Sequence, residues 1–406
     1  MHHMISNANL FSAFRHKNYP LLFLSTVMFS VGHYMMMIAL GWLILEKTDS
    51  SFLIGMIWVA RTLPFLIFGA LSGAVSDRID RRILLIATCS MLALCSFLLG
   101  ILTSSEDIPL WNYFLFAALM GSTIAFDMPS RQAFVFDIVG KGDAMSAISM
   151  NGVALRIMGV FGGLLAGVTI QYLGIYWCFY FMSIGYLIGL LAIVCIRGLK
   201  INTDSINQSF WQNLAEVLKI IRNNRIILAL AIMAIICEIF GFSFLALLPI
   251  FARDILKAGA LGLGWLNTTQ SAGALMGALF LASLGNYIHK GRLILGIFLL
   301  FGIFLIVFSQ SSWYPGSLFL MVVIGAMASS FDAMQHTLLQ LNVIEKQRGR
   351  AMGIWMLSIG FGPFGFALTG TMSAYLGAQL AITINGLAII FAFFILLVTP
   401  HRLARV

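Results

Sequence analysis

The chain is built around uninterrupted apolar runs such as YPLLFLSTVMFSVGHYMMMIALGWLIL, which begins at Tyr19. An α-helix needs about 20 apolar residues in a row to cross the hydrocarbon core of a bilayer. Of the 406 residues, 60% are hydrophobic and only 10% are charged, and the mean hydropathy is +0.97. A water-soluble protein of this length could not cover so much apolar surface with polar groups. The sequence therefore predicts an all-α membrane protein that crosses the bilayer many times.

Charged or turn-rich stretches divide the chain into twelve apolar segments. They lie near residues 19–45, 51–76, 83–103, 110–128, 144–171, 175–196, 226–252, 258–284, 292–310, 316–334, 350–373 and 379–399. The first run is long and is followed by similar ones, so it is not interpreted as a cleaved signal peptide. An even number of crossings places both termini on the same side of the membrane.

The distribution of positive charge predicts which side that is. Cytoplasmic loops of membrane proteins carry an excess of Lys and Arg. With the N-terminus in the cytoplasm, 19 of the 24 Lys and Arg residues lie on the cytoplasmic side. The other five are Lys47, Arg253 and Lys257 on the outer side, and Arg61 and Arg156 within the spans. Both termini are therefore expected in the cytoplasm, and the net charge of +9 indicates a lipid surface and no nucleic-acid partner.

The longest polar stretch separates six apolar segments from six. It predicts an N-terminal six-helix bundle over 1–196, a cytoplasmic linker over 197–225 and a C-terminal six-helix bundle over 226–406. Short motifs recur at equivalent places of the two halves, 205 to 208 residues apart: Gly69-Ala70-Leu71 with Gly277-Ala278-Leu279, Phe126-Asp127 with Phe331-Asp332, and Gly142-x-Ala144-Met145 with Gly349-x-Ala351-Met352. Such repeats predict two pseudo-symmetric bundles with a binding site between them at mid-membrane.

The linker contains the stretch FWQNLAEVLKII, which has an apolar face. Its members are Phe210, Leu214, Val217, Leu218 and Ile221. This pattern is typical of an amphipathic helix that lies along the inner membrane surface. A plain linker helix is the alternative, and the pattern does not separate the two.

The loop LSGAVSDRIDRRILL concentrates five charges between Asp77 and Arg82. It resembles the signature loop of the major facilitator superfamily, G-x-L-A-D-R-x-G-R-[RK]-x-x-L, although Asp80 stands where that pattern has glycine. The matching residues are Gly73, Val75, Ser76, Asp77, Arg78, Arg81, Arg82 and Leu85. The resemblance implies the twelve-helix fold of that superfamily and a transporter that works by alternating access. It also implies that the loop charges hold the two halves together in one state; a simple positive-inside anchor is the alternative.

These features predict a cytoplasmic gate at the inner ends of the helices. Its expected members are Asp77, Arg78, Arg81, Asp127, Arg131 and Asp332. An acid at a helix end can face the positive N-terminal end of a neighbouring helix, while Arg78 or Arg81 pairs with a second acid such as Asp127. Gly69 and Gly73, four residues apart, are expected to let another helix approach closely.

Three further stretches narrow the resemblance. GWLILEKTDSSFLIG, FDMPSRQAFVFDIV and FARDILKAGALGLGWL are similar to the exporter branch of the superfamily that includes enterobactin exporters and macrolide-efflux proteins. The resemblance implies a proton-coupled exporter of a drug-like or siderophore-like molecule, a monomer without cofactor, in the inner membrane of a bacterium. The chain departs from the branch at Gly32-His33, where Gly-Asp is common. The fifth segment, RIMGVFGGLLAG, lacks the proline of the exporter motif, and Gly362-Pro363 occurs instead in the eleventh.

Four ionisable side chains lie near mid-span: His33, Arg61, Arg156 and Glu238. A charge at bilayer depth costs about 2.5–3.5 kcal/mol on insertion scales, so each needs a partner, a cavity or a function. Glu238 is the only acid near the centre of the second half, and burial favours the protonated form of a carboxyl group. It is the first candidate for proton coupling; a static salt bridge to Arg61 or Arg156 is the alternative.

The other polar residues are assigned to a substrate cavity. His33 shares one helical face with Thr26, Ser30, Met37 and Gly41, so it is a second candidate for proton coupling or ligand binding, and a buried packing residue otherwise. Tyr34 borders this face. Arg61 is expected to bind substrate or a counter-ion, and Arg156 to make a structural pair. Gln270 adds an uncharged donor and acceptor.

Other classes of protein fit the sequence less well. It holds neither G-x-x-x-x-G-K-[ST] nor H-E-x-x-H, so an enzyme is not expected. The five cysteines all lie in apolar segments, which predicts neither a disulfide nor a metal site. An importer of a small nutrient or iron chelate with the same fold stays open, and so does a non-transporting membrane scaffold.

Overall fold

The computed structural model describes residues 11–105, 109–197, 221–222, 224–284, 288–343, 354–355 and 357–398. Within these ranges the chain is helical and contains no strand. The 3₁₀-turn η1 (Ser12–Arg15) precedes the helices α1 (Tyr19–Thr48), α2 (Ser51–Arg78), α3 (Arg81–Ser104), α4 (Trp111–Tyr172), α5 (Ile175–Cys195), α7 (Arg225–Ile236), α8 (Leu248–Ile250), α9 (Gly259–Ser283), α10 (Lys290–Ser309), α11 (Tyr314–Leu341), α13 (Gly362–Leu376) and α14 (Ala378–Val398). Most of the predicted linker helix, residues 198–220, lies outside the described residues.

The predicted fold class is confirmed. In the described part of the chain, nine helices are long and apolar enough to cross a membrane. The first part of α4, α9 and α13 add three shorter or less apolar crossings. The helix α4 covers two crossings, because Gly140 inside it has φ 68° and ψ −178° and turns the chain back. The result is the twelve-helix architecture of two six-helix bundles.

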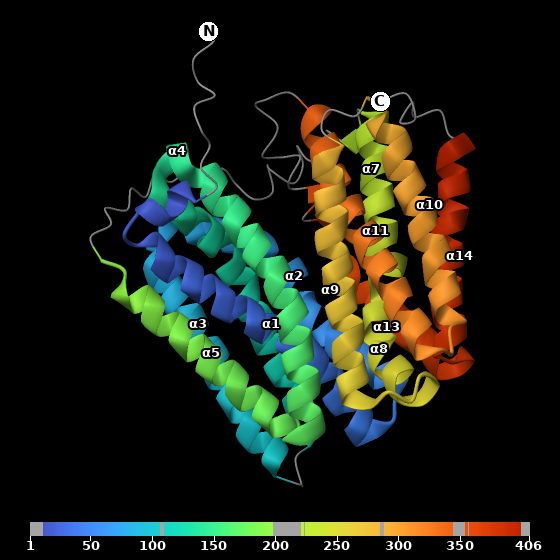
Figure 1. The fold of residues 1–406 in the computed structure, drawn as a ribbon, viewed down its shortest axis with the longest axis horizontal. Helices are drawn as coiled ribbons and strands as arrows, with labels where there is room; N and C mark the ends of the chain where they lie inside the picture. Colours follow the sequence, from blue (N-terminus) through green and yellow to red (C-terminus); the bar gives the residue numbers. More distant parts are fainter. Residues whose placement is uncertain are drawn as a thin grey trace.

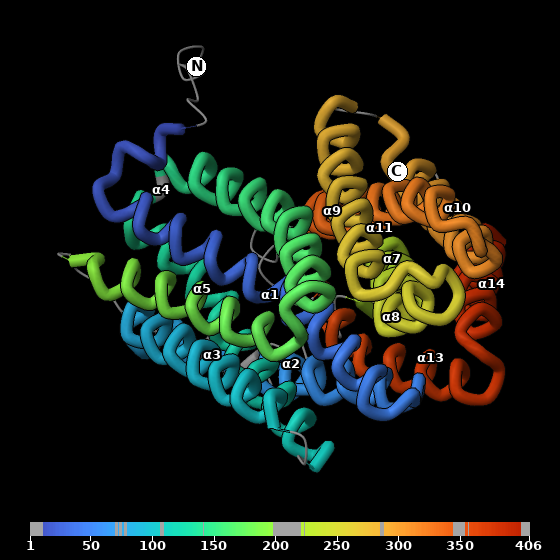
Figure 2. The backbone as a smooth tube through the Cα atoms, turned by 60° about the horizontal axis from the view of Figure 1, so that its bottom comes forward, coloured from blue at the N-terminus to red at the C-terminus, as the bar shows by residue number. Residues whose placement is uncertain are grey.

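The helices form two groups, α1–α5 and α7–α14, which Figures 1 and 2 show beside each other. We name the two ends of the molecule by the ends of α1: the Asn18 face, where it begins, and the Asp49 face, where it ends. The groups lean together at the Asp49 face and diverge toward the Asn18 face (Figure 1). Between the groups, the main helix contacts are α2 with α13 and α4 with α9.

Glycines without room for a side chain make the closest of these contacts. A Cβ atom on Gly55 of α2 would lie 2.6 Å from the carbonyl oxygen of Phe366 and 2.9 Å from the Cα of Gly370, both in α13. In the same way, Gly163 and Gly167 of α4 meet the backbone at Gly264 of α9. Small residues let helix backbones approach in this way inside a membrane.

The prediction that another helix approaches closely at Gly69 is wrong. No atom lies within 4 Å of a Cβ placed on this glycine. Gly55 makes the close contact on the same helix instead, because the two groups of helices touch nearer the Asp49 face. The side chain position at Gly73 lies outside the described residues.

The seventh crossing is not a regular α-helix. After α7 it continues through the π-turn η2 (Cys237–Gly241), the 3₁₀-turn η3 (Ser243–Leu247), α8 and a second π-turn, η4 (Phe251–Ile255). A buried polar cluster holds this break. Thr369 donates to Ser243 Oγ at 2.8 Å, and Asn385 Nδ2 donates to the same oxygen at 3.1 Å. Such breaks are tolerated at membrane depth only where the protein itself satisfies the polar groups.

A second buried network joins three helices of the first group. Arg131 Nε donates to Asp127 Oδ1 at 2.8 Å one turn earlier on α4, and both side chains are buried. Thr88 of α3 donates to Asp127 Oδ2 at 2.7 Å, and Arg131 Nη1 donates to Ser25 Oγ of α1 at 3.0 Å. The Arg131 guanidinium also lies 4.9 Å from the centre of the Phe29 ring. The ion pair is therefore fully enclosed in protein.

We predict that Gly55→Leu disfavours the closed contact at the Asp49 face. A leucine there must displace the backbone of α13, and overpacking costs about 1–3 kcal/mol. An energy of that size shifts a two-state equilibrium by about 5- to 150-fold. In a Cys195→Ser background, spin labels at Lys47→Cys and Lys257→Cys, exposed positions with one on each group, would report longer distances by electron resonance. Gly69→Leu on the same helix is the matched control and should leave the distances unchanged; equal effects of both variants would contradict the packing argument.

We also predict that Asp127→Asn destabilises the protein strongly. Removing one partner of a buried ion pair leaves the other charge uncompensated, at a cost of about 3–5 kcal/mol. Thermal unfolding in detergent measures the loss. Asp254→Asn, in an exposed pair with Arg253, should change stability by about 0–1 kcal/mol. A similar small change in Asp127→Asn would show that the network does not stabilise the fold.

Candidate functional site

The predicted cavity residues gather at two places, one within the first group of helices and one between the groups. The first centres on Arg61 of α2, which is 6% exposed. Its Nη2 lies 3.4 and 3.5 Å from the two ring nitrogens of His33 on α1. Its guanidinium carbon lies 5.3 Å from the centre of the Trp58 ring, one turn earlier on α2. A cation over an indole face at this distance is stabilised by the ring quadrupole.

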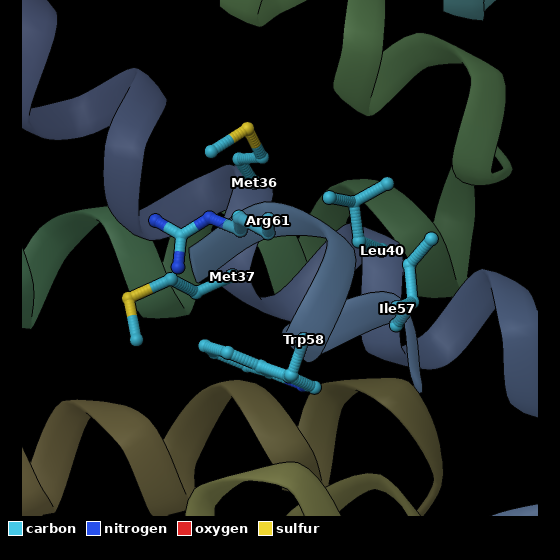
Figure 3. A pocket seen from close by; sticks show the side chains of 6 residues that line it. All are labelled: Met36, Met37, Leu40, Ile57, Trp58 and Arg61. Atoms are coloured by element: carbon cyan, nitrogen blue, oxygen red, sulfur yellow. The ribbon is translucent and has the colours of Figure 1, made fainter. Parts of the chain in front are cut away.

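Arg61 opens onto a small pocket between α1 and α2. Figure 3 shows its six lining side chains: Met36, Met37, Leu40, Ile57, Trp58 and Arg61. About 160 Å³ of its space is not occupied by atoms. This space includes open solvent and leaves no room for a water molecule among the side chains. A ligand group could therefore enter only after the lining side chains move, and Arg61 is the only ionisable side chain among these six residues.

The second place lies between the groups of helices and centres on Arg156 of α4. Its Nη1 donates to Ser329 Oγ of α11 at 2.7 Å and to the Ala274 carbonyl of α9 at 3.3 Å. One turn away, a Cβ on Gly159 would lie 2.9 Å from Ser271 Oγ and from the Tyr34 ring. Arg156 is thus held at the surface of the second group, and its bonds span both halves of the chain.

Two carboxyl groups of the second half interact electrostatically with each other, and one of them, Asp332, also interacts with Arg156. Asp332 is three residues after Ser329 on α11, so both side chains share one helix face, and Arg156 acts electrostatically on Asp332. Glu238 projects from the π-turn η2 and interacts electrostatically with Asp332. Gly362 of α13 packs beside it, since a Cβ there would lie 3.5 Å from Glu238 Oε2. Arg156 of one half is thus linked electrostatically, through Asp332, to Glu238 of the other half, and we refer to these three residues as the cluster.

The cluster changes two sequence-based interpretations. Within the described residues Glu238 forms no salt bridge with Arg61 or Arg156, so the alternative of a static pair is not what the structure shows. Asp332, which was predicted at the cytoplasmic gate, interacts electrostatically with Glu238 and Arg156, and its gating role stays a prediction.

Tyr34 and Gln270 border the two places. Tyr34 packs edge-on against His33, with ring centres 5.6 Å apart, and also interacts with Arg156, so it lies between the two sites. Gln270 is half-buried on α9, one turn before Ala274. Among the described residues its side chain makes no hydrogen bond, which leaves its amide available.

The expected gate residues are distributed differently from the prediction. Arg81 pairs with an acid as expected, but the acid is Asp137, at 2.6 Å, and not Asp127, which was given as the example. Asp127 and Arg131 bind each other inside the first group of helices. The side chains of Asp77 and Arg78 lie outside the described residues. The gating role of these residues stays a prediction.

The described side chains offer chemistry for binding and proton exchange. They contain no group of three or more His, Cys, Asp or Glu side chains that could hold a metal ion. What they do contain is an arginine in an apolar pocket and an arginine with two acids at the contact of two helix bundles.

Known proteins resemble this chain over almost its whole length. It is 26% identical to the staphyloferrin A transporter of Staphylococcus aureus over 376 residues, which cover 91% of this chain and 92% of the relative. It is 22% identical to macrolide efflux protein A of Streptococcus pyogenes, covering 85% of this chain and 86% of the relative. It is 25% identical to the enterobactin exporter EntS of Salmonella typhimurium, covering 82% and 80%.

The fold itself matches a solved transporter. The crystal structure of the nucleoside transporter NupG superimposes with a TM-score of 0.77 at 14% identity, over 94% of this chain and 100% of that one. The family model described as transmembrane secretion effector matches residues 8–404. This chain therefore belongs to the transmembrane secretion effector family of the major facilitator superfamily, and it is a membrane transporter.

Proposed function

We propose that the protein is a proton-coupled exporter of a drug-like or siderophore-like organic molecule that works by alternating access. The observation that supports this most is the cluster of Arg156, Asp332 and Glu238 at the contact of the two halves. The names of the relatives, which refer to siderophores and macrolides, support the substrate class. An importer with the same fold is the alternative, and the direction of net flux distinguishes the two.

The proposal includes a location and an orientation. The protein lies in the cytoplasmic membrane of a bacterium as a monomer, with the Asn18 face inward and the Asp49 face outward. Residues 1–196 and 226–406 are the two moving bundles, and 197–225 link them. The placement of positive charge supports this orientation. The described conformation is then one that is closed toward the outside.

Polar contacts at the Asp49 face support this interpretation. Arg253 pairs with Asp49 across the two groups of helices, and its Nη1 donates to the Leu45 carbonyl at 3.4 Å. Beneath them, a Cβ on Gly41 of α1 would lie 3.0 Å from the Pro249 ring. The two bonds of Arg253 and the packing of Gly41 on Pro249 must all break when the transporter opens outward.

The cluster suggests how proton binding is coupled to this movement. In the closed contact Arg156 balances the negative charge of Asp332, which lies beside Glu238. When the halves part, Arg156 leaves with the first bundle and two neighbouring carboxyl groups remain. Like charges in a low dielectric cannot both stay ionised, so the pair holds a proton. The return of Arg156 favours its release. Each cycle would thus carry a proton across the membrane.

We predict that the Asn18 face is cytoplasmic. In a Cys195→Ser background the remaining cysteines are buried. A membrane-impermeant maleimide added to intact cells should label Asp254→Cys, which is exposed at the Asp49 face, and should not label Lys17→Cys, which is exposed at the Asn18 face. Permeabilised cells should label both. The opposite pattern in intact cells would reverse the orientation and with it the direction assigned to the closed state.

We predict that Glu238→Gln abolishes coupling without unfolding the protein. Glu238 has no salt bridge to lose in the described structure, so its thermal stability should stay close to that of the wild type. Liposomes that contain a pH-sensitive dye report proton flux when staphyloferrin A, enterobactin or a macrolide is supplied under an imposed pH gradient. Wild-type protein should show flux with one of these classes, and Glu238→Gln should show a reduction of about tenfold or more.

The matched control is Asp254→Asn, which removes an acid from the outer surface and should transport normally. Substrate movement in the wild type without proton flux would contradict proton coupling. Net uptake against the substrate gradient in right-side-out vesicles would favour the importer.

A further inference from the structure

Arg61 differs from Arg131 and Arg156 because no acid among the described residues balances it. Arg131 pairs with Asp127 at 2.8 Å, and Arg156 interacts with Asp332. Within the described residues, Arg61 lies over the ring of Trp58 and contacts the two ring nitrogens of His33 at the long limit of a hydrogen bond. It also interacts electrostatically with Tyr186, whose buried hydroxyl makes no hydrogen bond there. A buried guanidinium without a counter-ion is costly in a low dielectric, so a charge of opposite sign would be bound strongly there.

The donors of Arg61 are also incompletely used. Its Nε–H is buried and has no hydrogen-bond partner among the described residues. Buried donors without partners are rare in folded proteins, and each calls for an explanation. A planar guanidinium presents its N–H groups as a fork that matches the two oxygens of a carboxylate. The free Nε and the weakly bonded Nη2 are two donors of this fork.

The position of Arg61 is fixed by the packing of its helix. Gly121 of α4 leaves no room for a side chain, because the Arg61 backbone carbonyl lies directly against it. Beyond the guanidinium, the pocket offers the thioethers of Met36 and Met37 and the face of Trp58. Methionine side chains adapt their shape to apolar groups of different outlines. The pocket is thus a fixed cation beside a deformable apolar surface (Figure 3).

We propose that Arg61 binds a carboxylate of the transported molecule, and that the adjacent apolar part of this molecule packs against Trp58, Met36 and Met37. The inference rests on the proposed function and names the chemical class of its substrate: an amphipathic organic acid. His33 lies against the same guanidinium and positions it. A neutral molecule of the same shape would leave the buried charge uncompensated and would bind more weakly.

The test compares acids with their primary amides, which have nearly the same shape and no charge. Octanoate with octanamide and 4-phenylbutyrate with 4-phenylbutanamide are added to the purified, full-length protein. Binding is measured from the shift in thermal unfolding at constant pH and without a gradient. The wild type should bind at least one acid about tenfold more tightly than its amide, as expected for hydrogen bonds to a charged group. Arg61→Gln should reduce this ratio to about one.

Lys17→Gln is the control, because it removes a positive charge from the exposed surface and touches neither site, and its acid-to-amide ratio should equal that of the wild type. Arg61→Lys keeps the charge but not the fork and should give an intermediate ratio. Equal binding of acid and amide by the wild type, no binding of any acid, or loss of the ratio in Lys17→Gln but not in Arg61→Gln would overturn the proposal. Because the assay uses no pH gradient, failure of proton coupling does not affect its result.

Discussion

The cost of a charge at membrane depth organises this structure. Hydrocarbon offers no water to a guanidinium or a carboxylate, so protein groups must compensate each one. Three arginines in the interiors of α2 and α4 meet this demand in different ways. Arg131 pairs with an acid of its own bundle, and Arg156 is held by the opposite bundle. Arg61 contacts an aromatic face and an imidazole and interacts electrostatically with Tyr186. Arg131 therefore stabilises one bundle, Arg156 depends on how the bundles meet, and for Arg61 we propose a ligand carboxylate.

The irregular seventh crossing follows from the same constraint. A π-turn widens the helix at Glu238, and such turns are found frequently at functional sites. It frees backbone groups that lipid could not satisfy, and the buried cluster of Ser243, Thr369 and Asn385 packs against the following turn. The acid is therefore placed beside α13 by a local distortion that the surrounding helices support.

The apolar runs of the sequence were sufficient to predict the fold, because each crossing of the membrane needs its own run. It also identified Glu238, Arg61, Arg156 and His33, since charges stand out in such runs. It could not identify their partners. The pairing of Arg81 with Asp137, and the close contact at Gly55 where Gly69 was expected, depend on how helices tilt against one another. Hydropathy holds no information on that tilt, because lipid-facing and protein-facing residues are both apolar.

The contacts between the bundles divide into two kinds with different consequences. Backbone contacts at Gly55 with Gly370 and at Gly167 with Gly264 depend only on shape, so they act in the same way whatever the charge state of the protein. Arg156 donates to Ser329 and to the Ala274 carbonyl and interacts electrostatically with Asp332. Under the proposed coupling, protonation of Asp332 weakens this second kind of contact and leaves the first unchanged. Because the glycine contacts do not depend on charge, the proposed binding of a proton would shift the balance between two rigid-body arrangements without disturbing either bundle.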